Sequence, residues 1–317
     1  MATTRLRETA RLAVAPPARG FSFLNALLIL VSLAAVLESG WHTNVSIAAF
    51  FDPSNVKGIT RFITGLFPPD LSGPFLVKIF SLIRETMEIS IVGTALAVVF
   101  AIPLSLAALR YRGEERSRQA QGTGAWLARW AVYYGARGTL NTLRAVPELV
   151  WALVFVVAVG LGPFPGVLAL AAHGTGILGK LYAELLESVD QRLVETVRST
   201  GATESLVTAF ARVPVALPML VSYTLFRWEC NMRAATVLGF VGAGGIGTEL
   251  VIAMKLFSYH EVLTLVIAIA ALVFIVDIVG QIVRTRLLDA PVVTTCRPGE
   301  GQGALQRLSA LFGRGDA

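Results

Sequence analysis

The sequence has few charged residues. Asp, Glu, Lys and Arg make up 15% of its 317 residues and hydrophobic residues make up 55%, whereas a soluble domain usually carries about 25% charged residues. The shortage is concentrated in long uncharged windows at 20–37, 89–109, 149–179 and 262–276. The first three of these windows reach the roughly 18 residues that indicate a bilayer span. The composition therefore predicts an all-α polytopic membrane protein and argues against a nucleotide-binding α/β sheet.

Cysteine and histidine are also scarce. The two cysteines, Cys230 in an apolar region and Cys296 in a polar tail, do not make a disulfide framework, and we interpret them as ordinary thiols. No cluster of Cys, His and acidic residues has metal-ligand spacing, and no Ser, His and Asp set suggests nucleophilic catalysis. His173 lies alone in a predicted span, which favours a packed neutral histidine over a proton or metal role. The sequence thus predicts no catalytic residue, metal or cofactor in this chain.

The basic residues orient the predicted spans. Four arginines precede the first apolar run, and seven lie in the segment 110–144 against two acids, so both segments are expected to be cytoplasmic. The N-terminal run resembles a signal peptide, but Glu38-Ser-Gly-Trp41 is a poor cleavage site, which favours a retained helix. Arg284 and Arg286 end the last span on the cytoplasmic side. About six transmembrane helices with both termini cytoplasmic satisfy these signals. The net charge of +6 reflects arginines facing anionic lipid, so no nucleic-acid partner is expected.

Five regions follow from this topology. We expect a cytoplasmic tail at 1–20, a first transmembrane helix at 21–41, an external segment at 42–87, a main transmembrane domain at 88–286 and a cytoplasmic tail at 287–317. The uncharged window 149–179 is too long for one span and too short for two, and a Gly-Pro-Phe-Pro-Gly turn lies in its middle. It is therefore divided into spans at 139–161 and 164–183, which a cytoplasmic loop at 184–213 follows.

Two glycine-rich stretches imitate nucleotide-binding motifs. Gly242, Gly244 and Gly247 spell G-x-G-x-x-G, but the preceding run begins on a membrane helix and no acid follows at the required distance of about 20 residues. The stretch 174–181 meets G-x-x-x-x-G-K but has a leucine where a P-loop needs Ser or Thr. We predict no nucleotide site at either place. With Gly245, the first cluster is interpreted as an outer turn, a candidate gate, that lets the chain fold back after a span.

The most informative polar segment is 195–214. Two short amphipathic helices are expected to meet at Gly201, because glycine takes positive φ and lets another backbone approach closely. Pro214 opens the next membrane helix, which is a favourable position for proline. A rigid bend of this kind suits docking in a groove of a soluble partner. An ordinary cytoplasmic helical hairpin gives the same pattern.

This segment resembles the EAA loop of ABC importer permeases, in which E-A-A is followed by three residues, G, nine residues and I-x-L-P. Glu195, Gly201 and Pro214 keep that spacing, whereas Thr-Val replaces the two alanines and Ala and Val replace Ile and Leu. The resemblance implies that the segment couples the permease to an ATPase subunit. The residues to which it assigns this role are Glu195, Ser199, Thr200, Gly201, Ala202, Thr203 and Pro214.

Two longer segments, 143–184 and 222–250, resemble the phosphonate-transporter permease (PhnE) family, and the resemblance covers roughly residues 80–286. It implies a MetI-like type I importer permease that forms a homodimer in the bacterial cytoplasmic membrane. Two ABC ATPase subunits, which would bind ATP and Mg, are implied on the cytoplasmic side, and a substrate-binding protein outside. The implied substrate is a phosphonate, phosphate or phosphite, which moves inward. The chain itself would hydrolyse nothing.

Ionisable residues within spans are candidates for function. Four of them lie in or near spans: Arg227, Glu229, Arg233 and Asp277. Glu229 and Arg233 stand at i, i+4 and can pair, as can Arg144 and Glu148, which favours structural roles. Alternatively, Arg227 or Arg233 lines the translocation path and offsets the charge of an anionic substrate.

Two other functions stay open at this point. One is an ABC importer permease for another small solute, and the other is an ion-coupled secondary transporter or channel that uses the buried charges. The Glu195, Gly201 and Pro214 spacing favours the importer, because a secondary transporter has no need of it. A membrane-embedded enzyme is disfavoured, because the sequence offers no catalytic constellation.

Overall fold

The computed structural model of this protein describes residues 23–43, 52–110 and 122–288. All the regular elements in these ranges are helices, which confirms the all-α fold class. The expected tail at 1–20 and most of the tail at 287–317, with Cys296, lie outside the described residues. The chain divides into two compact units, Met1–Thr64 and Gly65–Ala317.

The first unit contains α2 (Phe23–His42) and most of α3 (Pro53–Leu66). α2 is long and apolar enough to cross a membrane, as expected for the span at 21–41. α3 lies in the segment expected to be external, and it is amphipathic, with Lys57 and Arg61 on its polar side. Its N-terminus is capped by Asp52, whose carboxylate accepts hydrogen bonds from the hydroxyl and the backbone N–H of Ser54, and these bonds lower the pKa of Asp52.

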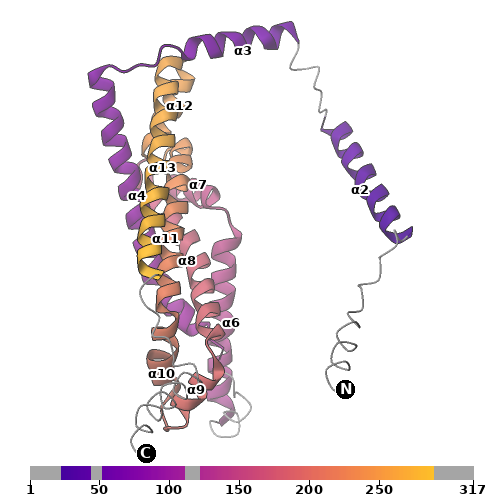
Figure 1. Ribbon diagram of the computed structural model, residues 1–317, viewed down its shortest axis with the longest axis vertical. Helices are drawn as coiled ribbons and strands as arrows, with labels where there is room; N and C mark the ends of the chain where they lie inside the picture. Colours follow the sequence, from indigo (N-terminus) through magenta and orange to yellow (C-terminus); the bar gives the residue numbers. More distant parts are fainter. Residues whose placement is uncertain (1–22, 44–51, 111–121, 289–317) are drawn as a thin grey trace, which may run out of the picture. The chain divides into compact units, whose positions relative to one another are not determined.

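The second unit is a helical bundle (Figure 1). Its helices are α4 (Gly73–Ala107), α6 (Gly122–Ala145), α7 (Glu148–Val159), α8 (Pro163–Ser188), α9 (Gln191–Arg198), α10 (Glu204–Val207), α11 (Val213–Leu238), α12 (Ile246–Lys255) and α13 (Tyr259–Leu288). α9 and α10 lie at one end of this bundle and α12 lies toward the other (Figure 1). α4 begins at Gly73, so it reaches well into the segment 42–87 that was expected to lie outside.

α8 is the centre of the bundle and packs against α4, α6, α7 and α11. Small residues make this possible. A Cβ at Gly176 would lie 2.5 Å from the backbone nitrogen of Arg144, and a Cβ at Gly174 would lie 2.8 Å from the Cβ of Ala97. Small residues at helix contacts let backbones approach closely within membranes. The G-x-x-x-x-G-K stretch at 174–181 is therefore part of a packed helix and forms no phosphate-binding loop.

Several helices are apolar enough to span a bilayer. In the described residues these are α2, α4, the continuous helix Glu204–Val241 and α13, and the bent pair α6 and α7 counts as a fifth if it is one span. α8, expected as a span at 164–183, is not among them. It carries Lys180, Glu184 and Glu187 near its end, and because other helices surround it, it does not need an apolar surface. The exact number of six spans and the orientation of the termini stay predictions.

Candidate functional site

α9 and α10 meet at Gly201, where the sequence suggested that two helices join. Gly201 has a φ of 82°, and its N–H donates to the carbonyl of Arg198. A Cβ at this position would have no heavy atom of the described residues within 4 Å. The left-handed backbone, rather than crowding, is therefore what requires glycine here. We call residues 190–214 the Gly201 bend.

A bidentate ion pair holds the two sides of the Gly201 bend together. Nε and Nη2 of Arg198 lie 2.8 Å and 3.0 Å from the two carboxylate oxygens of Glu204. This fork geometry fixes the relative orientation of the two side chains as well as their distance. This pair could not be predicted from the sequence, because a spacing of six residues corresponds to no helical neighbour rule and depends on the bend itself.

The Gly201 bend is anchored to the bundle by a buried apolar cluster. Val194, Val207 and Ala211 pack there with Leu186 and Val189 at the end of α8. Arg212 is also buried, with 1% of its surface exposed, and it donates from Nη1 to the carbonyl of Leu186 at 3.1 Å. The bend is thus anchored to the end of α8.

The outer surface of the Gly201 bend is open. Glu195, Ser199, Thr200, Gly201 and Thr203 are exposed, and Ala202 is half-buried against the apolar cluster. Three large apolar side chains are exposed on the same segment: Leu193, Leu206 and Phe210. Phe210 has 72% of its surface exposed. Polar and apolar groups are therefore both presented on a rigid support.

The second half of the Gly201 bend differs from the expected short helix. α10 is only four residues long and continues through a π-helical turn, Thr208–Arg212, into α11, so Pro214 stands inside a continuous helix. Pro214 has no N–H to donate to the carbonyl of Phe210, four residues earlier. A widened turn directly before the proline accommodates this missing bond.

α6 and α7 form a helix break in the interior of the bundle. Their axes differ by 91°, so the span expected at 139–161 is not a continuous helix. Pro147 precedes α7, and proline disfavours helical backbone in the residue before it. Two side chains form hydrogen bonds with the carbonyls that the break exposes. Nε1 of Trp151 donates to the carbonyl oxygen of Leu143 at 3.1 Å, and Nδ1 of His173 donates to that of Val146 at 2.9 Å. Such broken helices persist in membranes only where their backbone groups are satisfied.

Three ionisable side chains from three helices gather at this helix break. Nε2 of His173 on α8 lies 3.1 Å from Oε2 of Glu148 on α7, and Arg227 on α11 is close enough to interact electrostatically with both. Nε and Nη2 of Arg227 are buried and have no hydrogen-bond partner in the described part of the chain. Glu148 therefore pairs with His173 and not with Arg144, because the break turns α7 away from α6. We call Glu148, His173 and Arg227 the break cluster.

A second charged group joins α11 to α13. Oε2 of Glu229 lies 2.9 Å from Nη2 of Arg284, and Oδ1 of Asp277 lies 3.3 Å from Nη2 of Arg233. The expected pairing of Glu229 with Arg233 along α11 is thus wrong, since each side chain reaches the neighbouring helix. Gly280 leaves the space for Glu229, because a Cβ there would collide with its carboxylate. Arg233 and Asp277 stay about half exposed beside an open cavity of about 460 Å³.

The glycine turn, residues 239–247, connects α11 to α12. Gly242, Gly244 and Gly245 have φ values of 85°, 79° and 72°, and Gly247 lies so close to the backbone of Thr236 that a Cβ would overlap its carbonyl oxygen. The turn is closed onto α4: the N–H of Gly245 donates to the carboxylate of Glu85 and that of Ile246 donates to the hydroxyl of Thr86. Helix, rather than a strand, precedes the glycines, so no dinucleotide-binding unit is formed.

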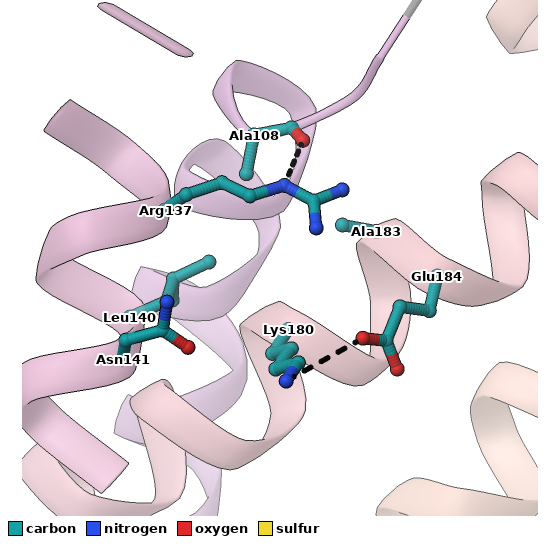
Figure 2. A pocket seen from close by; sticks show the side chains of 7 residues that line it. All are labelled: Ala108, Arg137, Leu140, Asn141, Lys180, Ala183 and Glu184. Carbon is teal, nitrogen blue, oxygen red and sulfur yellow. Dashed lines mark hydrogen bonds and ion pairs between the residues drawn. The ribbon is translucent and has the colours of Figure 1, made fainter. Parts of the chain in front are cut away.

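A small polar cavity of about 100 Å³ lies between α4, α6 and α8 (Figure 2). Figure 2 shows Arg137 directed at the carbonyl of Ala108, to which its Nε donates at 3.2 Å, and Lys180 directed at Glu184. Nη2 of Arg137 also lies 2.7 Å from Glu187. Each cation is faced by an acid, so the cavity has no excess charge for a ligand. Its side chains brace the end of α4 against α6 and α8.

An all-α bundle with several apolar helices, ionisable groups in its interior and an exposed bend at one end defines a polytopic membrane protein of the transport-permease class. Residues 122–289 match the family described as the binding-protein-dependent transport system inner membrane component. The phosphite transport system permease protein PtxC of Stutzerimonas stutzeri is 41% identical over 256 residues, 81% of this chain and 87% of that protein. The phosphate-import permease protein PhnE of Mycolicibacterium smegmatis is 35% identical over 255 residues, 80% of this chain and 44% of that protein.

The chain belongs to this family of binding-protein-dependent inner membrane components, and its resemblance to the PhnE permeases is confirmed. A solved structure of the MetNI methionine ABC transporter in an inward-facing conformation has the same fold. It matches with a TM-score of 0.55 and 19% identity and covers 68% of this chain and 99% of that chain. This likeness supports the MetI-like fold class.

Proposed function

We propose that this protein is the membrane-spanning permease of an ATP-driven importer that carries phosphonate or a related phosphorus oxyanion, phosphate or phosphite, into the cell. The names of the similar permeases, for phosphite and phosphate, support this substrate class. The chain would lie in the bacterial cytoplasmic membrane as a homodimer. A substrate-binding protein would deliver the anion from outside, and two ABC ATPase subunits would bind ATP and Mg on the cytoplasmic side.

The Gly201 bend is the observation that carries this proposal. Its exposed polar and apolar side chains stand on a support anchored to α8, and a groove of a soluble partner can bind such a surface. The bend also begins the continuous helix Glu204–Val241, which carries Arg227 of the break cluster. A displacement of the bend by closing ATPase subunits would therefore move α11 as one rigid body and change the surroundings of Arg227.

Arg227 is the group best suited to an oxyanion. A guanidinium offers planar N–H donors that match the oxygens of phosphate-like anions, and two of its nitrogens have no hydrogen-bond partner in the described residues. Ionisable side chains within membrane segments mark substrate pathways in many transporters. Arg233 stays a second candidate for lining the path, because it is half exposed beside the open cavity on α11 and α13.

The proposal is tested by reconstituting the complex in liposomes. The chain is co-purified with its ATPase subunits and binding protein. The rate of ATP hydrolysis is then measured in the presence of phosphonate, phosphate or phosphite. We expect at least one of these anions to stimulate hydrolysis. Bound ATPase subunits without stimulation by any of the three would indicate another small solute. Uptake that needs no ATP would indicate a secondary transporter and contradict the proposal.

A further inference from the structure

The hydrogen bonds of His173 fix the number of protons at the helix break. Nδ1 lies 2.9 Å from the carbonyl oxygen of Val146, and because a carbonyl only accepts, Nδ1 carries a hydrogen. Nε2 lies 3.1 Å from Oε2 of Glu148. An ionised carboxylate also only accepts, so this contact is a hydrogen bond only when a second proton lies between Nε2 and Oε2. Without that proton, two lone pairs face each other.

The groups around this pair come from four helices. Arg227 faces both members from α11, with Cys230 beside it, α6 contributes the carbonyl of Leu143, and the break itself contributes the carbonyl of Val146. The titratable side chains of α4 lie in its first half, near its contact with α12: Lys78, Arg84, Glu85 and Glu88. Arg227 therefore interacts electrostatically with both members of the pair, and Arg144 in the last turn of α6 is a second permanent charge near the break.

The shared proton decides the net charge of the break cluster. With the proton, the pair of Glu148 and His173 is neutral overall, whichever atom holds it, and the positive charge of Arg227 is uncompensated. When the proton is released to water, the pair carries one negative charge, which lies on the carboxylate of Glu148 and compensates Arg227. The break itself does not depend on this proton, because Nδ1 of His173 and Nε1 of Trp151 continue to donate to the exposed carbonyls.

We propose that Glu148 and His173 hold one exchangeable proton and that this proton determines whether Arg227 is available to the transported oxyanion. The inference rests on the proposed function for the identity of the anion. While the proton is held, the guanidinium of Arg227 attracts the anion. Once it is lost, Glu148 competes for the same guanidinium, and a second negative group is disfavoured there. Glu148 and His173 thus act as positioning residues for Arg227 without touching the anion themselves.

Glu148→Gln is the test variant. Its amide N–H can donate to the lone pair on Nε2 of neutral His173, so it imitates the protonated pair and cannot lose a proton. Uptake is measured in the reconstituted complex with whichever of phosphite, phosphate and methylphosphonate the wild type carries, over a pH series from mildly acidic to mildly alkaline. The ratio of variant to wild-type rate is taken at each pH, so that protonation of the anion and of the partner subunits cancels.

We expect a ratio near one at the acidic end that rises by about tenfold per pH unit above the titration midpoint of the pair. The control Glu184→Gln removes an acid from α8 that pairs with Lys180, outside the break cluster, and its ratio should stay flat. A flat ratio for Glu148→Gln would overturn the proposal. So would a folded Glu148→Gln complex without uptake at any pH, because the carboxylate itself would then be needed.

Infrared difference spectra provide a readout that does not need transport. Wild type minus Glu148→Gln should show, at acidic pH, the band of a protonated carboxyl or of an imidazolium ring, and the band should vanish as the pH rises. A spectrum with neither the protonated-carboxyl band nor the imidazolium band at any pH would contradict the shared proton. If the wild type carries none of the three anions, the proposed substrate class fails, and the infrared result still decides whether the pair holds a proton.

Discussion

The Gly201 bend and the glycine turn both depend on glycines with positive φ, but their surroundings are opposite. At Gly201 a Cβ would meet no described atom within 4 Å, whereas at Gly244 it would lie 2.6 Å from the carboxylate of Glu85 and at Gly247 it would overlap the backbone of Thr236. The turn is therefore locked against α4 and α11 within this chain, and the bend leaves its surface free. The turn thus packs within this chain, and the open surface of the bend is what the proposed docking of ATPase subunits requires.

The largest effect is expected from filling the turn. Gly247→Ala places a methyl group against the backbone of Thr236, and backbone cannot rotate away as a side chain can. Overpacking of this kind costs about 1–3 kcal/mol, occasionally more, so the unfolding midpoint in detergent should fall clearly. Gly138→Ala is the control, because a Cβ there meets nothing within 4 Å and the residue lies in helix α6. Equal stability of the two variants would show that the turn is not locked.

Gly201→Ala should separate function from folding at the bend. A left-handed backbone costs a residue with a side chain about 1–2 kcal/mol, so the bend is expected to relax away from its conformation while the bundle stays folded. We expect loss of ATPase-subunit binding in co-purification, with monodisperse protein. Gly201→Asn is the matched variant, because asparagine tolerates the left-handed region better than alanine, and it should keep more binding. If both variants bind the ATPase subunits as the wild type does, the left-handed conformation at Gly201 is not needed for binding.

Phe210→Ala probes the open surface directly. The side chain is 72% exposed, so its removal should change the free energy of unfolding by less than about 0.5 kcal/mol. A buried aromatic contact with a partner is commonly worth more than 1 kcal/mol, so affinity for the ATPase subunits should fall about tenfold. Titration of the subunits against the permease in nanodiscs measures this. Val132→Ala on α6, also exposed, should leave the affinity unchanged, and equal effects at both positions would place the docking surface elsewhere.

The smallest effect is expected from Arg198→Lys. Lysine keeps the positive charge but loses the two-pronged contact with Glu204, and partly exposed ion pairs contribute about 0.2–1 kcal/mol. The bend should loosen slightly, which hydrogen exchange at residues 199–203 would detect as faster exchange. Arg192→Lys on the same helix is the control, since its exposed side chain forms no ion pair with the described residues. Unchanged exchange in Arg198→Lys would show that the pair does not brace the bend.

The spacing of Glu195, Gly201 and Pro214 made the bend predictable from sequence, because a glycine between two helical stretches is a local signal. Long uncharged windows likewise predicted the fold class. The continuous helix through Pro214 was not predicted, since the widened turn before it has no composition of its own. α8 was expected as a span from its length, but packing by neighbouring helices buries most of its middle, and its charged residues lie partly exposed near its end.

The charged pairs could not be predicted from spacing alone. Neighbour rules along one helix suggested Arg144 with Glu148 and Glu229 with Arg233. In the structure, Glu148 pairs with His173 because the chain breaks at Pro147, and Glu229 pairs with Arg284 because α13 packs against α11. Both outcomes depend on tertiary geometry that joins residues far apart in the chain. The ionisable residues were therefore predictable from the sequence, but their partners were not.

The continuous helix Glu204–Val241 has a thermodynamic consequence. It joins the second half of the Gly201 bend to Arg227 through one continuous helix, and two binding events that bias the same element are linked reciprocally. If engagement of the bend changes the affinity of the interior for an anion by some factor, an anion in the interior must change the affinity of the bend for its partner by the same factor. In the proposed importer, binding of the anion in the interior would then change the affinity for the ATPase subunits through this helix.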